Sequence, residues 1–201
     1  MYYSTNAESW LIQEYEKRGI TSASTLASQR LSKAFNIQLF SAPQTPYSFY
    51  DEEDGMIMLD ITTDAMQQRK DFFHEFSHVL LHAGDQRSLP ESLIDYQESQ
   101  ARWFSLYAAM PYHILQGYLD QEPAVIARAF GVPLSMVKER LQQIQNRQLV
   151  NKVDKIGSQL PEKSAGYNPR EWSADTRRVM AQLQKQTGKG VYNHVGLQHK
   201  Y

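Results

Sequence analysis

The chain contains no cysteine among its 201 residues. Disulfide bonds, thiolate metal sites and cysteine nucleophiles are therefore excluded, and a reducing, intracellular compartment fits this composition. No apolar run approaches the length of a membrane span, and the first residues, MYYSTNAESW, lack the basic and then apolar pattern of a signal peptide. We therefore expect a cytoplasmic protein.

A strong net charge is also absent, since 21 Lys and Arg stand against 22 Asp and Glu. The signs are unevenly distributed: residues 1–150 hold 12 basic and 18 acidic residues, whereas residues 151–201 hold 9 basic and 4 acidic ones. Nucleic-acid binding by the body would require a basic footprint there. We instead expect a globular body and a basic, weakly structured tail over residues 149–201, with one short helix at residues 173–186.

The spacing of apolar residues predicts several helices around a small sheet, and hence a mainly helical α+β fold. We expect helices at residues 6–18 and 22–35, and strands at residues 37–40, 47–50 and 56–61. The strands are expected to form a small antiparallel sheet. Two further helices follow, one that ends near Ala83-Gly84 and one that runs from about Ser88 to Met110, where Pro111 stops it.

Residues 74–78, His-Glu-Phe-Ser-His, carry the strongest chemical signal. An α-helix turns by about 100° per residue, so His74 and His78 lie about 40° apart on one face and can bind one metal ion. Glu75 can reach a metal-bound water and take its proton. The opposite side of this helix is apolar, with Phe72, Phe73, Phe76, Val79 and Leu80. The segment therefore predicts a zinc peptidase helix with one buried face and one face open to a cleft.

A catalytic zinc usually takes three protein ligands and leaves one position for water. Glu98 is the preferred third ligand, because it lies on the small-residue face of the next long helix, as in thermolysin-like zinc peptidases. Asp95 and then Glu91 are the alternatives. His82 continues the spacing of four, but it lies about 12 Å along the axis from His74, so we expect it to support the site or the helix end.

Other roles in the predicted site stay open between several residues. Tyr107, Arg102 and His82 are candidates for the oxyanion donor. Asp71 and Asp95 are candidates for orienting a ligating imidazole. The strand at residues 56–61 is placed to bind the substrate backbone by strand addition.

Residues 123–145 resemble a helix-turn-helix unit, with Gly131 in the turn. We expect Met136, Val137 and Leu141 to pack inward and Lys138, Glu139 and Arg140 to be exposed. Because these exposed charges are of mixed sign, a structural or substrate-docking helix pair is favoured over a DNA reader. The expected domains are a catalytic domain at residues 1–112, this helical region at 113–148, and the tail at 149–201.

Two segments together resemble the signatures of the ImmA/IrrE metallopeptidases. Residues 69–82 resemble the family's segment around H-E-x-x-H, and residues 96–111 resemble its second signature, in which Glu98 falls on the family's glutamate. The match covers roughly residues 6–145. The chain departs from residues usual in the family at Phe73, Ser77, Gln100 and Arg102, but no proposed ligand or base is lost.

The resemblance implies a zincin-like fold in which His74, His78 and Glu98 hold Zn²⁺. It also implies a cytoplasmic endopeptidase of phage, mobile-element or stress systems that cuts a helix-turn-helix repressor and so relieves repression. The alternative is a non-catalytic regulator that binds DNA or protein and uses its metal structurally. A structural zinc normally has a fourth protein ligand, so an open position beside Glu75 favours catalysis.

Overall fold

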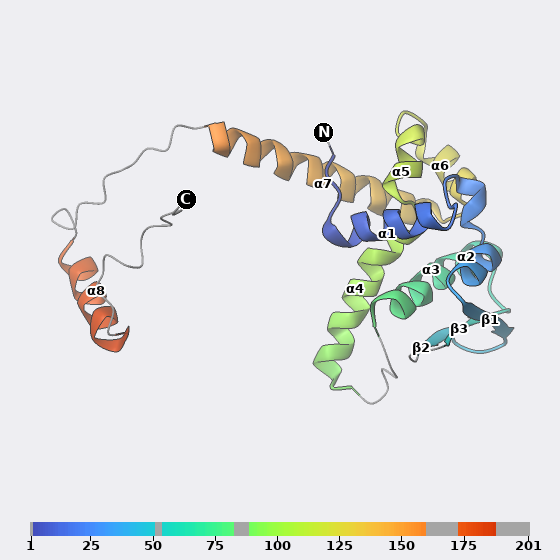
Figure 1. Cartoon of the computed structure of the whole chain (residues 1–201), viewed down its shortest axis with the longest axis horizontal. Helices are drawn as coiled ribbons and strands as arrows, with labels where there is room; N and C mark the ends of the chain where they lie inside the picture. Colours follow the sequence, from blue (N-terminus) through green and yellow to red (C-terminus); the bar gives the residue numbers. More distant parts are fainter. Residues whose placement is uncertain (1, 51–53, 83–88, 160–172, 188–201) are drawn as a thin grey trace. The chain divides into compact units, whose positions relative to one another are not determined.

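The computed structural model describes residues 2–50, 54–82, 89–159 and 173–187 (Figure 1). The chain divides into two units, residues 1–155 and residues 156–201. The first unit combines helices with one three-stranded sheet, which confirms the predicted α+β, mainly helical class. None of the described helices is long and apolar enough to cross a membrane. The expected three-domain division stays a prediction.

The first helices lead into the sheet and are α1 (Asn6–Lys17), the 3₁₀ helix η1 (Ala23–Leu26) and α2 (Ser28–Ala34). α1 agrees with the expected helix. The single helix expected at residues 22–35 is wrong, because Ala27 takes an extended conformation (ψ 137°) between η1 and α2. Such a ψ is incompatible with an α-helix, so the segment bends at this residue.

The sheet consists of β1 (Ile37–Ala42), β2 (Tyr47–Tyr50) and β3 (Gly55–Asp60), in the order β1-β3-β2. β2 and β3 are antiparallel, as expected, but β1 and β3 are parallel, so the fully antiparallel sheet is a wrong prediction. β3 carries the buried Ile57 and Leu59, and the central position allows both of its backbone edges to be hydrogen-bonded.

This strand order excludes substrate pairing on residues 56–61. Both edges of β3 are already paired, so the hypothesis that this strand binds a substrate backbone is wrong. Within the described part of the chain, β2 is instead an edge strand, and an edge strand presents unpaired backbone groups.

α3 (Ala65–Leu81) packs against β2, β3 and α4 (Glu91–Ala109). Its start is fixed by Asp64, whose side chain accepts hydrogen bonds from two backbone N–H groups of the first turn. The predicted buried face is confirmed for Phe72, Phe73, Phe76 and Val79. The small-residue face of α4 is confirmed as well, since Ala101, Ser105 and Ala108 are buried. The close approach of α4 to α3 follows from these small side chains.

The remaining helices are α5 (Tyr112–Leu115), η3 (Gln116–Tyr118), α6 (Pro123–Phe130), α7 (Leu134–Gln159) and, in the second unit, α8 (Ala174–Thr187). Gly131 between α6 and α7 has φ 64°, a left-handed conformation that favours glycine. Arg69 of α3 donates to the carbonyl oxygens of Phe130 (2.9 Å) and Leu26 (3.0 Å). These bonds tie α6 to the helix that carries the histidines.

Arg140 on α7 is fully buried, so its predicted exposure is wrong. Met136, Val137 and Ile144 line the buried side of α7, and Arg140 lies four residues from two of them, on the same helix face. Lys138 and Glu139 are exposed, as predicted. The burial of Arg140 therefore follows from the helical period and requires a buried partner for its charge.

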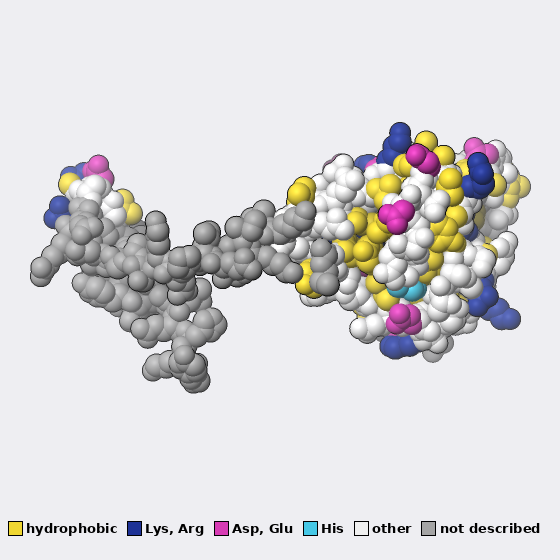
Figure 2. Space-filling model, turned by 90° about the horizontal axis from the view of Figure 1, so that it is seen from above, with side chains coloured by type: hydrophobic (Ala, Val, Ile, Leu, Met, Phe, Trp, Pro, Cys, Tyr) yellow, Lys and Arg dark blue, Asp and Glu magenta, His cyan; other side chains and the backbone are white. Residues whose placement is uncertain are grey.

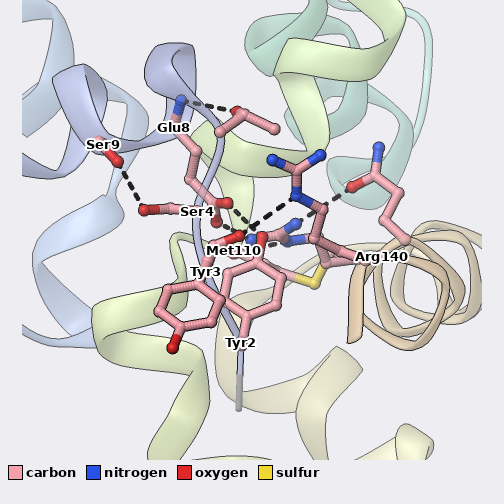
Figure 3. A network of polar contacts seen from close by, with 10 residues as sticks. Tyr2, Tyr3, Ser4, Glu8, Ser9, Met110 and Arg140 are labelled. Carbon is pink, nitrogen blue, oxygen red and sulfur yellow. Dashed lines mark hydrogen bonds and ion pairs between the residues drawn. The ribbon is translucent and has the colours of Figure 1, made fainter. Parts of the chain in front are cut away.

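That partner is Glu8 of α1, which is also fully buried (Figure 3). Arg140 also donates to the carbonyl oxygen of Met110 (3.1 Å) and to Oε1 of Gln143 (3.2 Å). The hydroxyl of Tyr2 donates to the Glu8 carboxylate. The network joins the amino-terminal segment, the end of α4 and α7 in the interior of the first unit.

Candidate metal centre

Three side chains from α3 and α4 converge on one point. Nε2 of His74 and Nε2 of His78 are 3.1 Å apart. Glu98 places Oε2 3.1 Å from Nε2 of His74 and Oε1 3.3 Å from Nε2 of His78. The ligand atoms of these three residues all lie within 4.8 Å of one another. A helix pair held close by small residues thus brings together the three residues that the sequence predicts.

The geometry of this group fits a metal ion. Tetrahedral zinc has ligand distances of about 2.0–2.2 Å, which separate neighbouring ligand atoms by roughly 3.3–3.6 Å. The observed separations of 3.1–3.3 Å are close to this range. Two imidazole nitrogens and a carboxylate form a donor set that catalytic zinc sites use.

The electrostatic environment keeps His78 in the form that binds metals. Burial, followed by the neighbouring His74, lowers the pKa of His78 to about 4, although Glu98 acts in the opposite direction. The imidazole is therefore neutral near pH 7. A neutral imidazole has a free lone pair for a cation, so no proton has to be displaced from this residue when a metal binds.

The other candidate ligands lie outside the group. Asp95 lines the cleft beside Glu98, and Glu91 lies in the exposed first turn of α4. His82 is the residue that ends α3, and its backbone N–H donates to the carbonyl oxygen of His78 (2.8 Å). Its ring centroid lies 5.4 Å from that of His78. This placement agrees with the helix-end role predicted for His82.

Glu75 lies beside the group, and a residue of the sheet holds its carboxylate by a hydrogen bond. Oγ of Ser48, on β2, donates a hydrogen bond of 2.8 Å to Oε2 of Glu75. Burial raises the pKa of the Glu75 carboxyl, while the bond from Ser48 and the neighbouring His74 act in the opposite direction. A carboxylate with a raised pKa is a stronger base than an exposed one. The sequence analysis missed Ser48, because one serine in a short strand carries no pattern that links it to a helix.

A cleft of about 690 Å³ lies between α3, α4 and α7, and His74 and Glu98 of the group line it. Arg102 lines this cleft, whereas neither Tyr107 nor His82 is among its lining residues. Tyr107 instead contacts Arg140, whose guanidinium carbon lies 4.8 Å from the centroid of the Tyr107 ring. Of the three oxyanion candidates, Arg102 is the one that lines this cleft, and its guanidinium lies 3.4 Å from the carboxylate of Glu139.

The predicted orienting carboxylates take different positions. Asp71 lines the cleft and accepts a hydrogen bond of 2.6 Å from Nε2 of Gln67, one turn earlier on α3. Asp95 lines the same cleft from α4. Their role in orienting an imidazole stays a prediction.

The sequence profile of peptidase family M78, the IrrE N-terminal-like domain, matches residues 32–142. The chain belongs to this family. The resemblance to the ImmA/IrrE metallopeptidases is thus confirmed, and the residues described above at the centre, from Ser48 to Arg102, fall within the matched range. The family makes the chain a peptidase of the IrrE type.

Two proteins of Bacillus subtilis (strain 168) are similar to this IrrE-type chain. The uncharacterized protein YqaB is 30% identical over 145 residues, which cover 70% of this chain and 84% of YqaB. The phage-like element PBSX protein XkdA is 29% identical over 152 residues, which cover 72% of this chain and 76% of XkdA. No solved structure is significantly similar.

Proposed function

We propose that the chain is a zinc-dependent endopeptidase in which His74, His78 and Glu98 hold Zn²⁺ and Glu75 is the catalytic base. The observation that carries this proposal is the group formed by His74, His78 and Glu98, whose ligand atoms all lie within 4.8 Å of one another, beside the half-buried carboxylate of Glu75. When bound, zinc supplies polarisation of the scissile carbonyl and lowers the pKa of a water towards about 7.

The side chains of the protein carry the proton transfers. Glu75 accepts a proton from the attacking water and later delivers it to the leaving amine. Ser48 holds one carboxylate oxygen of Glu75, so the other oxygen is available for the proton. Arg102 is positioned in the cleft to donate to the oxyanion, since a guanidinium there opposes the charge that develops.

The edge of β2 supports the binding of an extended polypeptide. One edge of β2 pairs with β3, the other edge has no partner among the described strands, and Ser48 of the same strand contacts Glu75. A substrate strand added to this edge would therefore run past the catalytic carboxylate. This role replaces the one expected for residues 56–61.

The substrate we propose is a helix-turn-helix repressor of a phage, mobile element or stress response, whose cleavage relieves repression. The similarity to XkdA, a protein of a phage-like element, supports such a setting. Because such a repressor acts in the cytoplasm, the proposed enzyme acts there as well.

The competing function, DNA binding by α6 and α7, is less well supported. Arg140 is buried in an ion pair and unavailable to a phosphate, and the exposed Lys138 is followed by the acidic Glu139. On the face seen in Figure 2, basic side chains are scattered among acidic and apolar ones. Binding through phosphates requires a concentrated basic surface.

The test is co-expression with repressors encoded near the gene for this chain, followed by mass mapping of any fragments. The wild type is expected to cut one repressor at a defined bond, and Glu75→Gln is expected to leave it intact while keeping its fold and metal. A Glu75→Gln protein that still cuts the repressor would refute the proposal.

A further inference from the structure

A second hollow continues the cleft along α4 and α7. It has a volume of about 510 Å³, and four residues line both hollows: Ser99, Arg102, Leu106 and Glu139. The residues that line the outer hollow alone are Trp103, Gln142, Gln143 and Asn146. We call these eight residues the α4–α7 groove. Because the hollows share a wall, a chain leaving the metal centre on this side enters the groove directly.

One side chain in the groove has an unused hydrogen-bond donor. Gln143 is 9% exposed, and its Oε1 accepts a bond of 3.2 Å from Nη1 of Arg140. Arg140 has only donors, so the amide oxygen of Gln143 must face it and the amide nitrogen must point elsewhere. Among the described residues, Nε2 of Gln143 has no hydrogen-bond partner. That nitrogen is itself buried, so Gln143 contributes a fixed surface to the groove and no accessible donor.

The orientation of Gln143 is fixed from the interior. Arg140 is itself held by the Glu8 carboxylate and by the carbonyl oxygen of Met110 (Figure 3). With Arg140 immobile, Gln143 cannot turn its amide without losing its bond. The buried network thus fixes the part of the groove wall that Gln143 forms.

The other walls of the groove suit a polypeptide. Gln142 and Asn146 are exposed amides joined by a hydrogen bond of 2.8 Å, and the indole of Trp103 is 55% exposed. Arg102 and Glu139 form an ion pair, with Nη2 of Arg102 3.4 Å from Oε2 of Glu139. The lining therefore offers amide groups and one aromatic surface, with no excess of basic charge for a phosphate.

We propose that the α4–α7 groove binds the segment of the protein substrate next to the scissile bond, with the exposed Trp103 contacting a large apolar side chain of that segment. This inference rests on the proposed peptidase function. Trp103 lies five residues after Glu98, about 7.5 Å along α4. An extended chain advances about 3.3 Å per residue, so the apolar side chain is two or three residues from the cleaved bond.

The first arm of the test uses peptides from a denatured bacterial proteome as substrates and reads the cleavage sites by mass spectrometry. The wild type is expected to favour large apolar residues two or three positions from the cut, on one side only. In Trp103→Ala, the preference for large apolar residues at these positions is expected to fall at least about fivefold. The residues found directly on either side of the cleaved bond are expected to be those seen with the wild type. Trp10→Ala, which removes another exposed indole (41%) outside the groove, is the matched control. An unchanged profile in Trp103→Ala overturns the inference and leaves the peptidase function standing.

The second arm does not depend on cleavage. Because the chain has no cysteine, Asn146→Cys can carry a single environment-sensitive fluorophore in a Glu75→Gln background. The same peptides are expected to shift its emission, and Trp103→Ala is expected to weaken the response. A label at Lys33→Cys on α2 is expected to give no shift. A response without cleavage by the wild type would support the groove and refute the peptidase, whereas no response at position 146 overturns the groove.

Discussion

Ser48 and Glu75 lie 27 residues apart in the chain, yet Oγ of Ser48 is 2.8 Å from Oε2 of Glu75. The bond joins the edge strand β2 to the helix that presents the histidines. Under the proposed function, the same strand pairs with the substrate and holds the catalytic base.

Ser48→Ala is predicted to lower kcat about tenfold with little change in KM. A hydrogen bond to a charged group contributes about 1.5–3 kcal/mol, and a loss of about 1.4 kcal/mol in transition-state stabilisation is a factor of ten. Steady-state kinetics on the mapped cleavage site measure the effect. Ser48→Thr keeps a hydroxyl and is expected to recover most of kcat. If the alanine variant retains full kcat, the hydroxyl does not hold the base.

The helical part of the centre is predictable from the sequence because its spacing is local. His74, Glu75 and His78 follow from the helical period alone, and Glu98 follows from the small residues beside it on α4. Ser48 is not predictable, since its position depends on which strand pairs with which. The sequence predicts an antiparallel sheet, whereas β1 and β3 are parallel. The order β1-β3-β2 provides hydrogen-bond partners for the backbone groups on both edges of the most buried strand, β3.

The metal-free protein is predicted to lose stability as the pH falls from about 6.5 to 4. The pKa of His78 is lowered to about 4 in the fold, so the unfolded chain binds a proton in this range that the folded chain does not. The free energy of unfolding therefore decreases with acidification, by an amount on the order of 2 kcal/mol from this residue. Urea unfolding of wild type and His78→Gln at several pH values measures the difference. Parallel pH profiles for the two proteins would rule out this contribution.

Arg140→Met is predicted to destabilise the fold by about 3–5 kcal/mol, because it leaves the Glu8 carboxylate buried without its cation. The double variant Glu8→Leu, Arg140→Met removes both charges and is expected to regain much of this loss. Chemical denaturation of the wild type, of Arg140→Met and Glu8→Leu alone, and of the double variant gives the coupling. Simple additivity of the two single changes would show that the buried pair does not act as a unit.

The burial of Arg140 shows where sequence analysis fails for a known physical reason. A charged residue on a helix is expected to face water, and its neighbours Lys138 and Glu139 do so. Arg140 lies on the stripe of Met136 and Ile144, and its distant partner Glu8 supplies the opposite charge that this buried position requires. A contact between residues 132 positions apart is set by tertiary packing, which a local pattern does not contain.

Zinc content measured on purified wild type, Glu98→Ala and Asp95→Ala tests the central claim most directly. The account predicts about one zinc per chain in the wild type and in Asp95→Ala, because Asp95 lines the cleft outside the ligand group. It predicts a large loss of zinc from folded Glu98→Ala. Full zinc occupancy in Glu98→Ala, or a wild type that binds no zinc, would contradict the proposed centre.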